Sequence, residues 1–337
     1  MRKLARIVKL DKVEKHSNAD TLDVCYIGGW SVVAKHGLHN TGDYVVYCEI
    51  DSWIPHSLAP FLTKEGKEPR VFEDVPGQVL KTVKLRGVVS QGLIIPTRDT
   101  LLDDTAIFEG NDVTELLGIL KYEPPVPAAL GGNARCSFPS IVPKTDAERV
   151  QNLCKEFEAW KQEGVQFCVT EKLDGTSVTF IKNEEDIHVC SRNWSLVESD
   201  NTYWHIYRKY NIEKVLAKIP FNCAIQGEIV GPGIQDNIYK LQAPTLYIFN
   251  IYNIDIKAYI AYSDMLELCN VCKLNVVPFI NITVINQNKT IEELLNYADG
   301  RSLINTNVSR EGLVYKGISN TRLNFKTISN EWLLKKN

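Results

Sequence analysis

The segment Val169-Thr-Glu-Lys-Leu-Asp-Gly-Thr-Ser177 decides how the second half of the chain is interpreted. An apolar strand ends here in Lys172, which is followed two residues later by a carboxylate, Asp174, and then by Gly175. In the two-residue period of a strand, Lys172 and Asp174 face the same side, and a glycine lets a ligand approach the backbone closely. A lysine whose pKa is lowered can act as a nucleophile. Taken alone, the pattern is explained more simply as an Asp-Gly surface turn.

Four later segments add the other groups that transfer of a nucleotide requires. Residues 225–231 place Glu228 in an apolar strand, where a lone carboxylate is costly unless it is paired or bound to a metal. Residues 309–316 place Glu311 at the start of another apolar strand. The other two segments are an aromatic strand, most of which we expect to be core, and a final basic strand: Tyr247–Tyr252 and Arg322–Lys326. Each is unremarkable alone, but together they supply a nucleophile, metal ligands and cations for phosphates.

Residues 1–121 are typical of a small β-barrel. Short apolar or alternating runs are separated by turn residues such as Asn18, Gly28-Gly29 and Gly77. The expected strands are Leu4–Leu10, Leu22–Ile27, Trp30–Ala34, Tyr44–Cys48, Thr82–Val88 and Leu93–Ile95. An OB-fold fits this spacing, and an SH3-like barrel would give a similar pattern.

A stretch rich in proline and glycine, Tyr122–Gly132, predicts an interdomain linker over residues 122–144. Thr145 and Glu148 then have the spacing of a capping box, which predicts a helix over Ala147–Gln162 that ends at Gly164. The remaining pattern is mixed. The expected strands are Gln166–Glu171, Ser177–Ile181, Ile187–Ser191, Cys223–Val230, Leu246–Tyr252, Gly312–Lys316 and Leu323–Lys326, and the expected helices are Asn201–Lys218, Ser263–Cys272 and Ile291–Asn296.

The expected fold class is therefore α+β, with an OB-like barrel over 1–121, a linker over 122–144 and a mixed α/β domain with antiparallel sheets over 145–337. The composition, 44% hydrophobic and 23% charged, is that of a soluble globular protein. No apolar run is long enough to span a membrane. A net charge of −3 means that any nucleic acid must be bound through a local basic cleft.

Nine cysteines without a framework spacing predict reduced thiols, and hence a cytoplasmic protein or one that also enters the nucleus. Cys269 and Cys272 have metal-like spacing, but no second pair accompanies them. Buried thiols on one helix face are the interpretation we favour over structural zinc. We expect the protein to be a monomer without a membrane partner.

The ordered set of segments resembles the collinear motifs of the covalent nucleotidyltransferases, which comprise ATP-dependent DNA ligases, RNA ligases and mRNA capping enzymes. The motifs are Lys172-Leu-Asp-Gly175, Gly227-Glu228, Tyr247–Tyr252, Glu311–Lys316 and Lys326. Further segments resemble RNA ligases of the Deinococcus and Naegleria type, whose OB domain precedes the catalytic domain: Leu10–Asp20, Gly42–Pro55, Leu85–Pro96 and Phe138–Arg149. The resemblance therefore covers nearly the whole chain.

The resemblance implies an ATP-dependent RNA ligase that uses Mg²⁺ or Mn²⁺. Lys172 is implied to take AMP from ATP and pass it to a 5′-phosphate of RNA, which a 3′-hydroxyl then attacks, with a nick in a duplex as the favoured substrate. The implied holders of the metal, largely through water, or of the ribose are Asp174, Glu228 and Glu311. The implied nucleotide contacts are Glu171 and Phe249 at adenine, Arg192 at the ribose or RNA end, and Arg149, Lys316 and Lys326 at phosphates, with Ser177 near the RNA 3′ end.

One position departs from the family pattern. Relatives usually end with two lysines separated by one residue, and the first of these is Asn324 here. Arg322, expected on the same strand face, is a possible replacement for its charge, although a solvated surface arginine is as good an interpretation. This departure puts the neutralisation of phosphate charge in doubt, but not the reaction class.

Two other functions remain open at this point. A GTP-dependent capping enzyme shares the lysine motif, but such enzymes carry their OB domain after the last motif. A non-catalytic OB protein that binds nucleic acid is the second. The first domain itself has two expected jobs, which are holding the pyrophosphate leaving group with its metal or gripping RNA through Lys81, Lys84 and Arg86.

Overall fold

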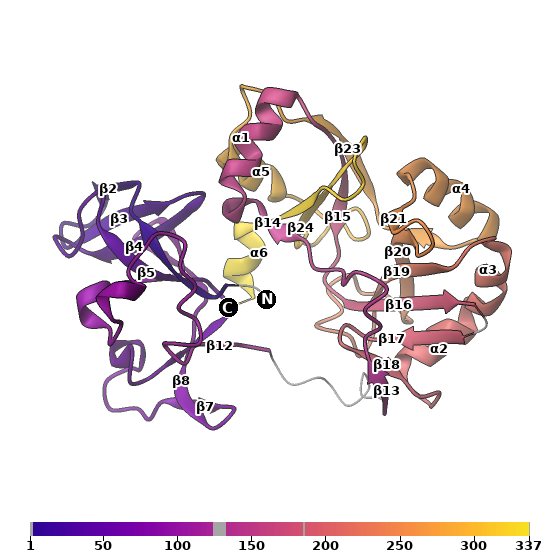
Figure 1. Cartoon of the computed structure of the whole chain (residues 1–337), viewed down its shortest axis with the longest axis horizontal. Coiled ribbons are helices and arrows are strands. Elements are labelled where there is room, and N and C mark those ends of the chain that lie inside the picture. Colours follow the sequence, from indigo (N-terminus) through magenta and orange to yellow (C-terminus); the bar gives the residue numbers. More distant parts are fainter. Residues whose placement is uncertain (1–2, 124–132, 185, 337) are drawn as a thin grey trace. The chain divides into compact units, whose positions relative to one another are not determined.

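The computed structural model describes residues 3–123, 133–184 and 186–336, and the chain divides into two compact units (Figure 1). Unit 1 comprises residues 1–125 and 333–337, and unit 2 comprises residues 126–332. Both ends of the linker expected over 122–144 belong to the two units instead. Tyr122 stacks on Trp53 within unit 1, with ring centroids 5.8 Å apart, and Ala134–Ser137 form a strand of unit 2. Much of Tyr122–Gly132 falls outside the described residues.

Unit 1 is an OB-like arrangement of short strands in small sheets, ordered β1-β5-β11, β2-β3-β4, β9-β10 and β12-β6-β8-β7. Its strands are β1 (Ala5–Lys9), β2 (Lys12–Lys15), β3 (Leu22–Ile27), β4 (Trp30–Lys35), β5 (Tyr44–Cys48), β6 (Ser52–Pro55), β7 (Arg70–Phe72), β8 (Val75–Val79), β9 (Thr82–Leu85), β10 (Val88–Gln91), β11 (Leu93–Pro96) and β12 (Leu120–Lys121). Alternate residues of β5 face two different apolar clusters, Val46 and Cys48 in one and Val45 and Tyr47 in the other. This burial on both faces explains why the β5 sequence is apolar throughout.

The single strand expected over Thr82–Val88 is wrong, because this segment is a hairpin. β9 and β10 pair with Leu85 opposite Val88, so Arg86 and Gly87 form the two-residue turn, both with positive φ (47° and 99°). Such turns match the twist of the flanking strands. Arg86 therefore does not share a strand face with Lys84.

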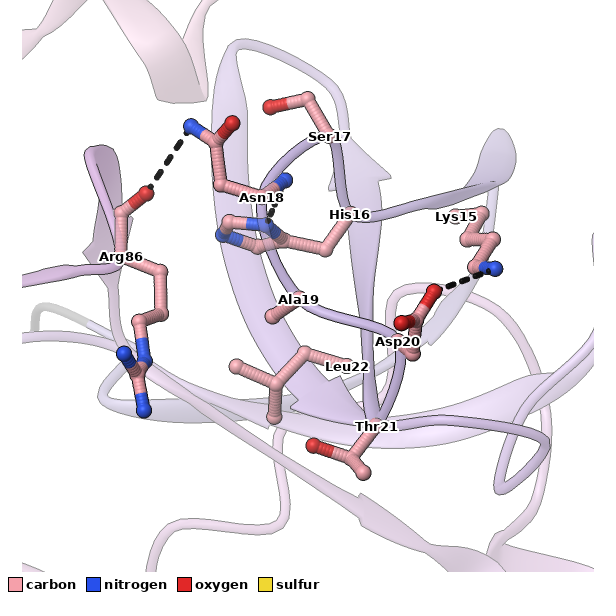
Figure 2. A pocket seen from close by; sticks show the side chains of 9 residues that line it. All are labelled: Lys15, His16, Ser17, Asn18, Ala19, Asp20, Thr21, Leu22 and Arg86. Carbon is pink, nitrogen blue, oxygen red and sulfur yellow. Dashed lines mark hydrogen bonds and ion pairs between the residues drawn. The ribbon is translucent and has the colours of Figure 1, made fainter.

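The turn at Arg86 is joined to the loop between β2 and β3. Asn18 Nδ2 donates to the carbonyl of Arg86 at 3.2 Å, and the His16 ring hydrogen bonds the carbonyl of Leu85 at 3.0 Å. Figure 2 shows the open hollow between them, which has a volume of about 850 Å³ and is lined by residues 15–22 and Arg86. Lys15, on its rim, is paired with Asp20 at 2.8 Å.

Unit 2 contains two sheets, one ordered β13-β18-β17-β16-β19-β20-β21, with β22 also on β20, and the other β14-β25-β24-β15-β23. The strands are β13 (Ala134–Ser137), β14 (Glu148–Arg149), β15 (Gln166–Lys172), β16 (Thr176–Asn183), β17 (Asp186–Cys190), β18 (Trp194–Leu196), β19 (Cys223–Val230), β20 (Thr245–Asn253), β21 (Ala258–Tyr259), β22 (Asn275–Val276), β23 (Phe279–Val284), β24 (Gly312–Gly317) and β25 (Asn324–Ile328). Most pairings are antiparallel, as expected, with the exceptions β14–β25 and β20–β22.

Six α-helices are described, and the five that lie wholly in unit 2, α1 to α5, make it with the sheets the mixed α/β domain that was predicted. They are α1 (Cys154–Glu163), α2 (Thr202–Lys209), α3 (Ile212–Lys218), α4 (Tyr262–Cys272), α5 (Ile291–Ala298) and α6 (Asn330–Lys335). The helix expected over Asn201–Lys218 is interrupted at Asn211, whose φ is 48°. Within the described ranges, no helix is both long and apolar enough to cross a membrane.

The helix predicted to start at a Thr145–Glu148 capping box begins instead at Cys154. The Thr145 hydroxyl contacts that of Ser177 at 3.0 Å, and Glu148 accepts from the amide of Arg149 at 2.7 Å, so neither side chain caps a helix. The predicted end is confirmed, because Gly164 follows α1 in the left-handed conformation.

Each sheet of unit 2 is covered by helices on one face (Figure 1). Helices α2, α3 and α4 pack on the larger sheet through an apolar cluster that includes Phe180 and Ile225. Cys269 lies in this cluster and Cys272 packs against it, which supports the interpretation as buried thiols. Helices α1 and α5 pack on the smaller sheet.

Phe325 is a fully buried aromatic residue of the α1–α5 core, and replacing it with alanine is expected to destabilise unit 2 by about 3–5 kcal/mol. Its ring stacks between Tyr315 and Trp160, with centroids 4.5 and 5.3 Å away, and it is fully buried. Chemical denaturation would measure the loss. A loss below about 1 kcal/mol would contradict this packing.

Candidate active site

Lys172, the last residue of β15, lies at the centre of the candidate site. Its Nζ donates to both carboxylate oxygens of Glu311, at 2.7 and 2.8 Å. Glu311 is buried and directly precedes β24, which pairs with β15 so that Gly312 lies opposite Lys172. The sheet therefore brings together two residues that are far apart in the sequence.

The Lys172-Leu-Asp-Gly175 motif carries the chain from one sheet of unit 2 to the other. β15 belongs to the smaller sheet and β16, which begins at Thr176, to the larger one. A Cβ atom on Gly175 would lie 2.4 Å from the carbonyl oxygen of Ile229, so only glycine fits this crossing. The amide of Asp174 donates to the Tyr239 hydroxyl at 2.7 Å. The motif is thus a fixed junction rather than an exposed Asp-Gly turn.

Three carboxylates set the electrostatics of Lys172. Burial acts to lower the pKa of its ammonium, but the charges of Glu311, Glu228 and Asp174 outweigh burial and hold the pKa above its usual value. Burial, together with the charges of Glu311 and Asp174, raises the pKa of Glu228 to about 8 against the opposing charge of Lys172. The site therefore carries more negative charge than its own lysine neutralises.

The proton on Glu228 makes the stability of the protein depend on pH. Between the ordinary carboxyl pKa of 4.5 and the raised value of about 8, the folded protein holds a proton that the unfolded chain has released. The free energy of unfolding therefore falls as the pH rises through this interval.

Replacing Glu228 with glutamine removes this titration, so Glu228→Gln is expected to stabilise the apo protein by about 1–2 kcal/mol at pH 8.5 and to change little at pH 5. Denaturation of both proteins at the two pH values would measure the difference. Equal stability of both proteins at pH 8.5 would contradict the raised pKa.

The basic residues predicted to contact phosphates share one face of the smaller sheet. Arg149 lies opposite Lys326 in the β14–β25 pair, and Lys326 lies opposite Val314 of β24. Lys316 is two residues further along β24, opposite Cys168 of β15. Because residues opposite one another share a face, these cations lie on the face that also carries Lys172.

Of the two interpretations of Arg322, the structure supports the exposed surface arginine. β25 begins at Asn324, and Arg322 lies in the preceding turn, where it is exposed and donates to the carbonyl of Lys257 at 3.2 Å. Asn324 occupies the strand position opposite Lys316. Arg322 therefore does not replace the missing lysine.

Glu171 and Phe249, the residues predicted to contact adenine, each have a distinctive environment. One oxygen of Glu171 accepts from the amide of Leu303 at 2.7 Å, whereas the other is buried and has no hydrogen-bond partner in the described part of the chain. Burial raises the pKa of Glu171. Phe249 is the extra residue of a β-bulge in β20, and Lys316 Nζ lies 5.4 Å from its ring centroid. Bulges often redirect a side chain at functional sites.

Arg192 and Ser177 lie on the larger sheet with Glu228. Ser177 is opposite Glu228 in the β16–β19 pair. Arg192 lies between β17 and β18 and makes a bidentate ion pair with Asp146, at 2.8 and 2.9 Å. The sequence analysis missed three contacts at the site, those of Tyr239, Asp146 and Thr145, which lie in irregular segments.

Comparisons with known proteins follow the same division of the chain. An OB-fold domain model matches residues 4–97, and the RNA ligase model matches residues 165–332. A Naegleria gruberi RNA ligase structure in the apo form is 38% identical and superposes with a TM-score of 0.92, covering 100% of this chain and 98% of that one. The chain belongs to the RNA ligase family. A comparison with curated proteins found no match.

Two further structures of the Naegleria RNA ligase carry ligands. One, with ATP and Mn, has a TM-score of 0.91 at 38% identity and covers 99% of both chains. The other, with pyrophosphate, has a TM-score of 0.92 at 38% identity and covers 100% of this chain and 99% of that one. The family assignment thus rests on both units of this chain.

Asp174, Glu228 and Glu311 are the residues that would hold the divalent cation. Among residues 3–123, 133–184 and 186–336, no three His, Cys, Asp or Glu side chains converge closely enough to hold a metal together. Asp174, Glu228 and Glu311 nevertheless all act on the pKa of Lys172. A cation with its own waters would relieve their mutual repulsion.

Proposed function

We propose that this ATP-dependent RNA ligase joins RNA 3′-hydroxyl and 5′-phosphate ends, preferentially at nicks, through AMP carried on Lys172. The bidentate contact between Lys172 and Glu311, surrounded by further carboxylate charge, is the observation that carries the proposal. A lysine held in this way is fixed at one position and has to lose its proton before it can attack.

The protonation of Lys172 follows from the charges around it. In the resting site the carboxylates stabilise the ammonium. Asp174, Glu228 and Glu311 would hold Mg²⁺ or Mn²⁺, and the bound cation supplies positive charge beside the phosphates. When the carboxylate charge is neutralised, burial remains and favours the neutral amine of Lys172. Its lone pair can then attack the α-phosphate, with pyrophosphate as the leaving group.

The remaining predicted residues would bind the nucleotide and the RNA. The unsatisfied oxygen of Glu171 could accept from the adenine amino group, and the ring of Phe249 could stack on the base. The phosphates would lie against the face that carries Arg149, Lys316 and Lys326. Arg192 would have to exchange Asp146 for the ribose or the RNA end, and Ser177 lies beside Glu228 for the 3′-hydroxyl.

We further propose that the protein acts as a monomer in the cytoplasm or nucleus, with unit 1 as the OB domain and unit 2 from residue 145 onward as the catalytic domain. The cysteines, most of which are buried free thiols, suit a reducing compartment.

A panel of substrates tests the function. Nicked duplexes and single strands, with RNA or DNA on the 3′-hydroxyl side, are incubated with ATP or GTP and Mg²⁺ or Mn²⁺. We expect ATP-dependent sealing that is fastest for a nick with RNA on the 3′-hydroxyl side. Faster covalent labelling of the protein by GTP than by ATP would favour the capping reaction. RNA binding without any adenylylation of the protein would favour a non-catalytic protein.

A further inference from the structure

A series of hydrogen bonds runs from Lys316 on the smaller sheet, through two residues of the larger sheet, to the backbone of Pro143 in the irregular segment before β14. Lys316 Nζ donates to the carbonyl of Phe249 and, at 2.6 Å, to Asn250 Oδ1. Asn250 Nδ2 donates to Gln226 Oε1 at 3.2 Å. Gln226 Nε2 then donates to the carbonyl of Pro143 at 2.9 Å. Five residues from four separate parts of the sequence are thereby linked.

The two ends of this series fix the direction of every bond in it. An ammonium can only donate, and a backbone carbonyl can only accept. Asn250 must therefore present its oxygen to Lys316 and its amino group to Gln226, and Gln226 must be oriented in the same sense. Gln226 is completely buried, so reversing either amide would leave polar atoms unpaired in the interior.

The fold places the side-chain amides of Gln226 and Asn250 within hydrogen-bonding distance of each other. Gln226 and Asn250 lie opposite each other in the β19–β20 pair, immediately next to the bulge in which Phe249 is the extra residue. The bulge lets Phe249 and its neighbour Asn250 both contact Lys316, one through the backbone and the other through the side chain. Lys316 itself is on β24 of the smaller sheet.

We propose that Asn250 and Gln226 are positioning residues that hold the Lys316 ammonium with one N–H directed at the α-phosphate of the nucleotide. An ammonium has three N–H bonds, and Phe249 and Asn250 use two of them. The neutral amine has only two N–H bonds, so its lone pair would face the phosphate instead. Burial lowers the pKa of Lys316 to about 7. The carbonyl of Phe249 and the Asn250 oxygen both accept from Nζ, and acceptors at this position favour the ammonium, which is the form that binds phosphate. The inference rests on the proposed contact between Lys316 and phosphate.

Binding of AMP and of adenosine, measured separately by calorimetry, tests this role. The measurements use the full chain with Lys172→Met, so that no covalent transfer occurs. Adding Asn250→Ala or Gln226→Leu is expected to weaken AMP binding about tenfold or more, as for loss of a hydrogen bond to a charged group. Adenosine, which lacks the phosphate, should bind within about twofold of its original affinity. A loss of general structure would weaken both ligands alike.

The control and a second variant keep the outcomes distinct. Asn275→Ala removes a comparable amide bond, from Asn275 Nδ2 to the carbonyl of Leu246 on β20 at 3.2 Å, and should leave AMP binding unchanged. Asn250→Asp keeps an acceptor for Lys316 and should retain more AMP affinity than Asn250→Ala. Melting temperatures identify any variant that fails to fold. If Asn250→Ala does not fold, AMP and adenosine binding are compared in Asn250→Asp and Gln226→Leu instead.

Lys316→Ala separates the inference from the proposed function. If Lys316→Ala loses selectivity for AMP over adenosine but the Asn250 and Gln226 variants do not, the positioning role is overturned and the proposed function stands. If Lys316→Ala keeps the selectivity, the phosphate contact of Lys316 and the inference both fail, whereas adenylylation of Lys172 can still be measured independently.

Discussion

Replacing Lys172 with alanine is expected to abolish formation of the covalent enzyme–AMP species, with a loss of about 10⁴-fold or more in the adenylylation rate. No other group can take over, because Nζ of Lys172 is the amine that the site fixes through both oxygens of Glu311. Transfer of label from α-labelled ATP to the protein, followed on a denaturing gel, measures the effect. Retained labelling at an unchanged rate would refute the assignment of the nucleophile.

A matched lysine shows whether the loss is specific. Lys161 lies on α1 of the same unit and pairs with Glu158 at 3.0 Å, away from the carboxylates around Lys172. Lys161→Ala should therefore adenylylate normally. The Lys172→Ala protein should still seal RNA that already carries a 5′-adenylate, since that step no longer needs the amine. Failure with this substrate, in a protein that is folded, would mean that Lys172 also acts after the first step.

The second large effect is expected for Glu311→Gln, which should slow adenylylation by about 10²- to 10³-fold. Glutamine keeps the shape of the side chain but removes its charge, so Lys172 loses the partner that orients it. With burial still acting, the pKa of Lys172 should fall in the variant. Single-turnover adenylylation measures the rate, and the pH dependence of labelling by an amine reagent measures the pKa.

The rates of the two reactions of Lys172, with the amine reagent and with ATP, are expected to change in opposite directions. A lower pKa makes more of the neutral amine available, so reaction with the small reagent should increase while transfer of AMP decreases. Adenylylation within about threefold of the original rate would show that Glu311 is not required to orient the lysine. A pKa that stays high would show that Glu228 and Asp174 suffice to stabilise the ammonium.

The strands that carry the site were predictable because their sequences follow the two-residue period. Cys223–Val230 was predicted with the bounds that β19 has, and the strand before Lys172 was predicted to within one residue. The grouping of Lys172, Glu228 and Glu311 came from the order of motifs along the chain, a pattern that only a shared ancestor explains. The contact between Lys172 and Glu311 at 2.7 Å needed the structure.

The predictions from local sequence patterns were wrong where the residues concerned make tertiary contacts instead. Thr145 and Glu148 have capping-box spacing, yet the Thr145 hydroxyl is engaged by Ser177 on β16. The capping box that does form is Thr290 with Glu293, at the start of α5. Arg86 was placed on a strand because Gly87 was not recognised as part of a two-residue turn. In each case a few residues fit two structures equally well, and distant contacts decided between them.

The series of hydrogen bonds from Lys316 to Pro143 could not be predicted from the sequence. Gln226 and Asn250 are ordinary strand residues, and nothing in their spacing marks them as partners. Their relation follows from the register of β19 on β20, including the bulge at Phe249. A one-residue slip in that register would turn the amides to opposite faces.

The order of strands in the smaller sheet also has a consequence for the newly made chain. β15 carries Lys172, but its neighbour β24 and the next strand, β25, are made more than a hundred residues later in sequence. Until β24 leaves the ribosome, Lys172 has no Glu311, and the cations on β24 and β25 are missing as well. We therefore expect that a partly synthesised chain does not adenylylate its Lys172, so that only molecules with a complete catalytic sheet enter the reaction cycle.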